Sequence, residues 1–217
     1  PEVTNSAAMI MPNAILPDSA YSWTGTKMGS GQTISVVFDR IGPNNEVLTI
    51  GGRVKTAVAS AFDIQPPNED QWAALHPVAA AWIYVSLASN AGNWAASANS
   101  TNSWGDPELH NGRADAARHA YWNVLMAFSS LVGPGLAQQA GFAHERSNFE
   151  NNAPHNEIAM DLTNNQGGLA IATALPPDSS VAQQQAAVVN AITTGSLVIL
   201  DTLENSPPEG LLQPSNR

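Results

Sequence analysis

The side chains best suited to chemistry gather in one part of the chain, between residues 110 and 165. Cysteine is absent from the sequence. Thiolate nucleophiles, disulfides and cysteine-ligated zinc are therefore excluded, which leaves imidazoles, carboxylates, hydroxyls and amides. Four of the five histidines fall in this stretch, together with several acids. The clustered residues are His110, His119, His144, His155, Asp115, Glu145, Glu150, Glu157 and Asp161.

Helical spacing places many of these groups on shared faces. In ADAARHAYWNVLM, polar and large residues recur at i, i+3, i+4, i+7 and i+8, while small residues fill the opposite side. This pattern predicts a helix whose polar face turns inward, and a buried polar face needs either partners or a function. The face contains Asp115, Arg118, His119, Trp122, Asn123 and Met126.

A second helix repeats this arrangement, and a third segment lies between the two. FAHERSN places His144, Glu145 and Asn148 at the end of an intervening helix. Because short loops join the three helices, we expect their polar groups to converge on one site. The second polar face consists of Glu157, Asp161, Asn164, Asn165 and Gly168.

Two chemistries suit this set, and the sequence does not choose between them. A histidine held by a carboxylate acts as a general base, with a second histidine or an arginine stabilising negative charge. Alternatively, His119, His144 and Asp161 supply two imidazoles and one carboxylate to a divalent metal ion, with Asn165 supporting the ligands. A divalent metal ion is the only cofactor that these residues suggest.

Structural explanations stand beside the functional ones. Asp115 and Arg118 have the spacing of an ordinary helix ion pair, and His119 alone would be a satisfied core histidine. We expect His110 and His155 to be solvated and His76 to be structural. HERSN lacks the second histidine of a zinc-protease HExxH motif, because Asn148 stands there.

The elements that must position these residues are mainly helical. We predict a mainly α fold, a bundle of five to six helices with a small N-terminal β-hairpin and an extended arm. The arm covers residues 1–23, and the hairpin pairs β-branched runs at 33–39 and 47–54. Helices are expected at residues 77–98, 114–131, 136–146, 157–172 and 181–203, followed by a loosely held tail. The predicted domains are residues 1–65, the arm and hairpin, and residues 66–217, the helical catalytic or binding domain.

Composition limits the partners of the chain. The formal net charge is −10, with 8 Lys plus Arg against 18 Asp plus Glu. Such a surface repels nucleic acid and anionic membranes. Only 12% of residues are charged, so an uncharged polar surface is expected. The apolar run Val78 to Ala88 is too short to span a bilayer, which predicts a buried core helix and no stable membrane insertion. A lysine-poor chain, rich in Asn and Ser, that begins at Pro1 with no visible signal peptide is typical of a mature exported protein or of a piece cut from a longer one.

Three motifs in order carry a resemblance to a known family. HNGRADAARHAYWNVLM, FAHE and MDLTNN resemble an uncharacterised bacterial domain family that shares a DAxRHxxWN helix, an HE pair and an MDLxNN helix. Members often occur at the C-termini of secreted or polymorphic-toxin-like proteins. The resemblance covers about residues 75–170. It points to Asp115, Arg118, His119, Trp122, Asn123, His144, Glu145, Asp161, Asn164 and Asn165. Gln166, Gly167 and Gly168 stand where the family commonly continues with Gly-Arg.

The leading functional hypothesis is a secreted hydrolase that acts on a phosphoester, ester or amide bond. The resemblance implies export and attack on cell-envelope material, so the expected substrate is a small molecule or an envelope component. In this hypothesis His119 is the base or a metal ligand oriented by Asp115, and His144 with Glu145 completes the set. Asp161, Asn123 and Asn165 position water and substrate, and Arg118 offsets negative charge. The alternative is a non-catalytic binding or structural module with a satisfied buried network.

Overall fold

The computed structural model describes residues 21–26, 33–38, 67–106, 109–201 and 211–216 of the chain. These residues are mainly helical, and the helices of the described part number six if α3, η1 and α4 are counted as one continuous helix. The prediction of a mainly α bundle of five to six helices is therefore confirmed. The helices are α2 (Glu69–Leu75), α3 (Pro77–Trp82), the π-helical turn η1 (Ile83–Leu87), α4 (Ala88–Asn102), α5 (Arg113–Phe128), α6 (Gly133–Glu150), α7 (His155–Ala174) and α8 (Val181–Thr194).

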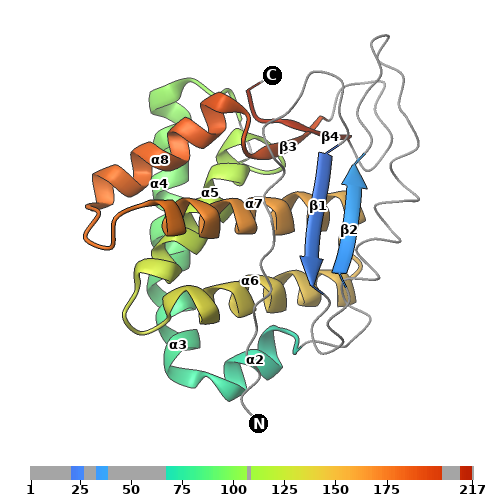
Figure 1. The fold of residues 1–217 in the computed structure, drawn as a ribbon, viewed down its shortest axis with the longest axis vertical. Helices are drawn as coiled ribbons and strands as arrows, with labels where there is room; N and C mark the ends of the chain where they lie inside the picture. Colours follow the sequence, from blue (N-terminus) through green and yellow to red (C-terminus); the bar gives the residue numbers. More distant parts are fainter. Residues whose placement is uncertain (1–20, 27–32, 39–66, 107–108, 202–210, 217) are drawn as a thin grey trace.

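Helix α5 lies at the centre of the bundle. It packs against α4, α6, α7 and α8, and most of its 16 residues are buried. In Figure 1, α6 and α7 run side by side in opposite directions, and α8 lies along the other side of α7. The predicted site helices therefore form the middle of the structure rather than its edge.

The close packing of α5 on α7 depends on Gly168. A side chain at this position would collide with the backbone carbonyl of Ala120 and with Cβ of Asn123. The absence of a Cβ lets the two helix backbones approach each other. Gly168 thus sets the distance across which the polar faces of α5 and α7 meet.

The N-terminal hairpin differs from the predicted one. Strand β2 (Thr33–Phe38) is the first of the two predicted β-branched runs, but its antiparallel partner is β1 (Tyr21–Thr26). The predicted partner, residues 47–54, lies outside the described residues, as do residues 1–20 of the predicted arm. The prediction missed β1 because YSWTGT begins in a segment rich in Pro, Asn and Ser, which was assigned no element.

The C-terminal helix is shorter than predicted. Helix α8 ends at Gly195, which adopts a left-handed conformation with φ of 73° and caps the helix. The chain then forms β3 (Val198–Asp201), which pairs with β4 (Leu211–Pro214). The prediction of a helix to residue 203 was wrong because the apolar run after Gly195 was taken as its continuation. Residues 211–214 of the predicted loose tail form a strand.

The predicted core helix around residues 78–88 is only half buried. Ile83 and Leu87 face the core, whereas Val78 and Val85 are 67% and 80% exposed. The spacing places Ile83 and Leu87 on one face of the helix and Val78 and Val85 on the opposite face. The continuous apolar run therefore predicted burial on both faces, whereas only one face is buried. No single helix in the described part of the chain is long and apolar enough to span a membrane. The bent pair formed by α2 and residues 77–102 meets the length and composition criteria only jointly.

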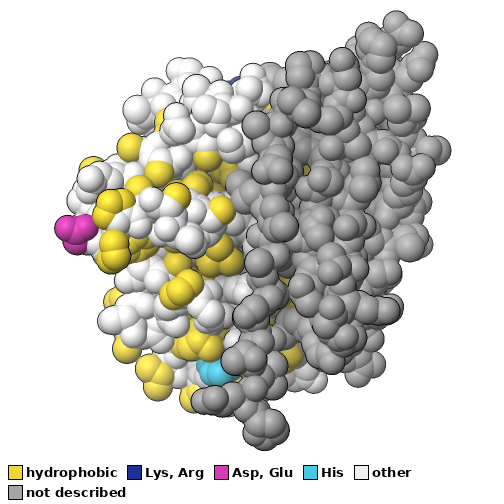
Figure 2. Space-filling view, in the orientation of Figure 1, with side chains coloured by type: hydrophobic (Ala, Val, Ile, Leu, Met, Phe, Trp, Pro, Cys, Tyr) yellow, Lys and Arg dark blue, Asp and Glu magenta, His cyan; other side chains and the backbone are white. Residues whose placement is uncertain are grey.

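One face of the described part carries few charged side chains. Figure 2 shows one face on which charged side chains of the described residues are sparse among uncharged and hydrophobic ones. This agrees with the uncharged polar surface expected from composition.

We predict that Gly168→Ala destabilises the protein, whereas Gly92→Ala does not. The first change forces α5 and α7 apart and should cost about 1–3 kcal/mol of the free energy of unfolding. Gly92 lies within α4 with nothing within 4 Å of an added Cβ, so alanine there should stabilise by roughly 0.5–1 kcal/mol. Urea unfolding of both variants measures the difference, and equal stability would contradict the proposed close approach.

Candidate functional site

The first turn of α5 fixes the Asp115 carboxylate. The preceding loop ends at Gly112, where any side chain would collide with the Asp106 carboxylate. Asp106 in turn accepts a hydrogen bond from the backbone N–H of Ala114 at 3.1 Å, which caps the start of the helix. Asp115 Oδ2 accepts from the backbone N–H of Asn111 at 2.6 Å. The fully buried Asp115 is thus held by backbone on one oxygen and leaves Oδ1 for the site.

One turn further along α5, His119 is held by an amide from α7. Its Nδ1 lies 3.2 Å from Asn165 Oδ1, which also accepts a hydrogen bond from Asn123 Nδ2 at 2.8 Å. A carbonyl oxygen cannot donate, so Nδ1 of His119 carries the proton. The lone pair of the neutral ring is then on Nε2, which points to the opposite side.

Glu145 of α6 completes this chain of hydrogen bonds. Its Oε1 accepts from Asn165 Nδ2 at 3.1 Å and its Oε2 from Asn148 Nδ2 at 2.9 Å. Burial raises the pKa of Glu145, and the two amide donors act against this rise. The carboxylate fixes the orientation of the Asn165 amide and, through it, the tautomer of His119. Asn148, the residue that breaks the HExxH motif, therefore has a structural partner of its own.

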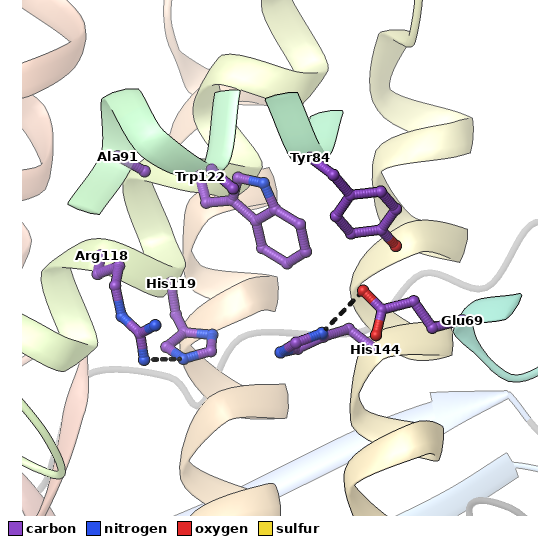
Figure 3. Close-up of a pocket in the computed structure, with 8 residues that line it drawn as sticks. Glu69, Tyr84, Ala91, Arg118, His119, Trp122 and His144 are labelled. Carbon is purple, nitrogen blue, oxygen red and sulfur yellow. Dashed lines mark hydrogen bonds and ion pairs between the residues drawn. The ribbon is translucent and has the colours of Figure 1, made fainter. Parts of the chain in front are cut away.

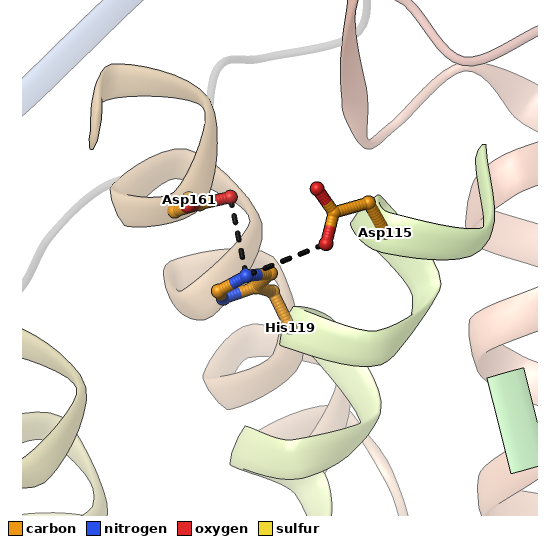
Figure 4. Close-up of side chains that lie close together, drawn as sticks. All are labelled: Asp115, His119 and Asp161. Atoms are coloured by element: carbon orange, nitrogen blue, oxygen red, sulfur yellow. Dashed lines mark ion pairs between the residues drawn. The ribbon is translucent and has the colours of Figure 1, made fainter. Parts of the chain in front are cut away.

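Two carboxylates and a guanidinium surround Nε2 of His119. Asp115 Oδ1 lies 3.6 Å away and Asp161 Oδ1 3.3 Å away (Figure 4). Arg118 Nη2 lies 3.0 Å from the same nitrogen and also forms an ion pair with Asp115 Oδ1. The two carboxylates of Asp115 and Asp161 and the imidazole of His119 form a group that could hold a metal ion.

The buried environment shifts the pKa values of this group. Burial, followed by the charge of Arg118, lowers the pKa of His119 to about 3, so its ring is neutral at ordinary pH. Burial and then the charges of Glu145 and Asp115 raise the pKa of Asp161 well above its usual value. Burial alone would raise the pKa of Asp115, but the basic groups of His119 and Arg118 outweigh it and lower that pKa.

A pocket of about 120 Å³ opens beside this group. Arg118 and His119 line one side, and His144 lies opposite, with its ring centroid 6.5 Å from that of His119 (Figure 3). The aromatic rings of Trp122 and Tyr84 complete the wall, together with Ala88 and Ala91. Tyr84 belongs to η1, and such π-helical turns are frequent at functional sites.

His144 is tied to α2 by an ion pair. Its Nδ1 lies 3.2 Å from Glu69 Oε1. Burial alone would lower the pKa of His144, but the hydrogen bond to Glu69 and the charges of Glu145 and Glu69 raise it. The same hydrogen bond is the main reason that the pKa of Glu69 is lowered. The two histidines of the pocket are therefore shifted in opposite directions.

The structure brings the predicted site residues together near His119, most of them around its ring. Asp115, Arg118, Asp161, Asn123 and Asn165 lie around the His119 ring, Glu145 lies behind Asn165, and His144 faces His119 across the pocket. The predicted metal ligand set of His119, His144 and Asp161 needs correction. The ligand atoms of Asp115, His119 and Asp161 lie within 4.8 Å of one another, so Asp115 rather than His144 joins His119 and Asp161 in this group.

Sequence reasoning missed two residues of the pocket and predicted the wrong exposure for a third. Glu69 and Tyr84 line the pocket but lie on segments without a polar helical pattern. The capping box of Asn68 and Gln71 marks the start of α2 next to Glu69, and it is the one sequence feature that indicates where Glu69 lies. Arg118 was predicted to face inward, but its side chain is 44% exposed.

The remaining motif residues have structural roles. Asn164 pairs with both backbone groups of Val198 at 2.9 and 3.0 Å, which attaches β3 to α7. His76 packs on Trp72 between α2 and α3, as expected for a structural residue. His110 is 55% exposed, and His155 packs edge-on against Phe149.

Residues 71–196 match the family model described as Domain of unknown function (DUF6973), and the chain belongs to this family. The match covers α3 to α8 completely and α2 from residue 71 onward, so the pocket residue Glu69 lies just outside it. It confirms the expectation of an uncharacterised domain family. No solved structure gives a significant match to the chain.

We predict that Glu69→Gln lowers the pKa of His144. The change removes the carboxylate whose hydrogen bond and charge raise that pKa, so the imidazole loses its proton at lower pH than in the wild type. NMR titration of the imidazole signals measures the shift. Asp70→Asn, on the neighbouring exposed residue, is the control and should change the pKa of His144 much less. A His144 pKa that Glu69→Gln leaves unchanged would contradict the ion pair.

Proposed function

We propose that this protein is a hydrolase whose site lies between α5, α6 and α7. His119 Nε2 either accepts a proton from the attacking water as a general base or, with Asp115 and Asp161, would hold a divalent metal ion that would activate the water, and His144 donates a proton to the leaving group. The bond cleaved is a phosphoester, an ester or an amide. The expected setting is secretion and attack on cell-envelope material, which the motif resemblance suggests.

The observation that carries this proposal is that His119 and His144 face each other across one pocket, with ring centroids 6.5 Å apart and different hydrogen-bond partners. Environments that separate the pKa values of two neighbouring groups are how active sites assign one group as base and the other as acid. His119 is neutral with its lone pair turned to the carboxylates, and the ion pair with Glu69 favours the protonated form of His144. A purely structural network has no need for both rings to line a pocket.

The donor set also fits a divalent metal ion. Ligand atoms about 2.0–2.2 Å from one ion lie roughly 2.8–3.6 Å apart at octahedral or tetrahedral angles. The distances from His119 Nε2 to Asp115 Oδ1 and Asp161 Oδ1, 3.6 and 3.3 Å, fall in this range. The chain from Glu145 through Asn165 to Nδ1 is the kind of support that metal-binding histidines have. Such an ion would lower the pKa of a bound water and polarise the substrate.

The test is hydrolysis by the full chain, with and without added Mn²⁺ or Zn²⁺. The substrates are a p-nitrophenyl phosphodiester, a p-nitrophenyl ester and peptidoglycan fragments. We expect one class to be cleaved, and His119→Gln and His144→Gln each to lower kcat/KM by about a hundredfold or more. His155→Gln, outside the pocket, is the control and should retain activity.

Two results would contradict the proposal. One is folded, ion-supplemented protein that cleaves none of the three classes. The other is activity that survives both pocket substitutions. Either would favour the alternative of a non-catalytic module in which Glu145, Asn165 and His119 form a buried structural network.

A further inference from the structure

The guanidinium of Arg118 lies where a cation bound by this site would lie. Arg118 donates to Asp115 Oδ1 through Nε at 3.0 Å and through Nη2, and Nη2 is also 3.0 Å from His119 Nε2. These are two of the three ligand atoms in the Asp115, His119 and Asp161 group. A positive charge from the protein itself therefore faces the lone pair and the carboxylate that an ion would use.

Arg118 satisfies only part of the group. Asp161 Oδ1 is buried and makes no hydrogen bond, although it lies 3.3 Å from His119 Nε2 and points toward it (Figure 4). Asp161 as a whole is only 9% exposed. None of the described residues donates a hydrogen bond to this oxygen, and a bound cation would supply a partner for it. The three side chains are thus arranged for a cation that also reaches Asp161.

Arg118 and a metal ion cannot occupy the group together. The lone pair of His119 Nε2 can serve one acceptor role at a time, and two positive charges at this distance repel each other. The Arg118 side chain is 44% exposed and lines the pocket, so it can move without disturbing the core. Displacement would carry the guanidinium from Asp115 toward the pocket.

We infer that Arg118 substitutes for the cation in the ion-free protein, and that ion binding displaces it into the pocket, where it holds the phosphoryl group of a phosphoester substrate. This inference rests on the proposed function and narrows its substrate class. The planar guanidinium matches phosphate oxygens with two parallel hydrogen bonds. An ion and an arginine together are the usual means of stabilising a transferring phosphoryl group.

Charge supports a phosphoester over a neutral ester or amide. The chain carries a formal net charge of −10 with only 8 Lys plus Arg, yet one of these arginines lines the pocket. After displacement the guanidinium has lost its Asp115 partner, and a neutral substrate offers no anionic oxygens to replace that carboxylate. An anionic substrate group restores the pairing. Metal and phosphate binding should then be coupled through Arg118.

The experiment measures two bindings by calorimetry on the full chain after treatment with a chelator. Mn²⁺ is titrated into the wild type, Arg118→Gln and Asp161→Asn, and inorganic phosphate is then titrated with and without saturating Mn²⁺. Arg146→Gln is the matched control, because Arg146 pairs with Glu150 on α6. Circular dichroism confirms that each variant is folded.

We expect Arg118→Gln to bind Mn²⁺ about tenfold or more tightly than the wild type, because the competing guanidinium is gone. Asp161→Asn should bind Mn²⁺ at least about tenfold more weakly. Phosphate should bind the wild type only with Mn²⁺ present, and Mn²⁺-loaded Arg118→Gln should bind it at least about tenfold more weakly. Arg146→Gln should match the wild type in both titrations.

The inference is overturned if the wild type binds no Mn²⁺, or if Arg118→Gln leaves Mn²⁺ affinity unchanged or reduces it. It is also overturned if phosphate binds equally well without Mn²⁺, or equally well to the loaded Arg118→Gln variant. Failure of the proposed function is separate: Mn²⁺ and phosphate would bind as expected, yet no substrate class would be hydrolysed. If the protein hydrolysed an ester or amide and a chelator had no effect, the proposed hydrolase function would stand, but this inference would be overturned.

Discussion

The arrangement of this site depends on one chain of buried hydrogen bonds, from the Glu145 carboxylate through the Asn165 amide to Nδ1 of His119. Three helices contribute one residue each, so the chain forms only when α5, α6 and α7 are packed together. These hydrogen bonds determine which nitrogen of the His119 ring carries the proton. Because the amide oxygen of Asn165 must accept, the proton is on Nδ1 and the lone pair of His119 faces Asp115 and Asp161.

Two glycines and the cap of α5 position the helices that form this series of hydrogen bonds. Gly168 lets α7 approach α5 closely enough for Asn165 to reach His119, and the Gly112 turn with its Asp106 cap sets where α5 begins. Asn164, next to Asn165, binds the backbone of Val198 and so ties α7 to the C-terminal strands. The paired asparagines therefore divide two tasks. One attaches β3 to the bundle, and the other orients the histidine.

Much of this could be predicted from residue spacing, and the exceptions have physical causes. The polar faces of α5 and α7 follow from helical periodicity, which is a local property, and their convergence follows from short loops. The pairing of His144 with Glu69 could not be foreseen, because it depends on where α2 packs against α6, 75 residues away in sequence. Strands β3 and β4 were missed for a different reason: the apolar run after Gly195 continues the hydrophobic pattern of α8, so it was taken as helix. The predicted metal ligands included His144 rather than Asp115, because residue spacing does not show which groups lie closest to His119 Nε2.

The central claim is that the buried chain fixes His119 as the neutral tautomer with its proton on Nδ1. Long-range ¹H–¹⁵N correlation spectra of the imidazole, recorded at pH 7 on chelator-treated protein, distinguish the three protonation states of the ring directly. The structure predicts a protonated Nδ1 and an unprotonated Nε2 for His119. A spectrum showing the proton on Nε2, or a doubly protonated ring, would contradict this account.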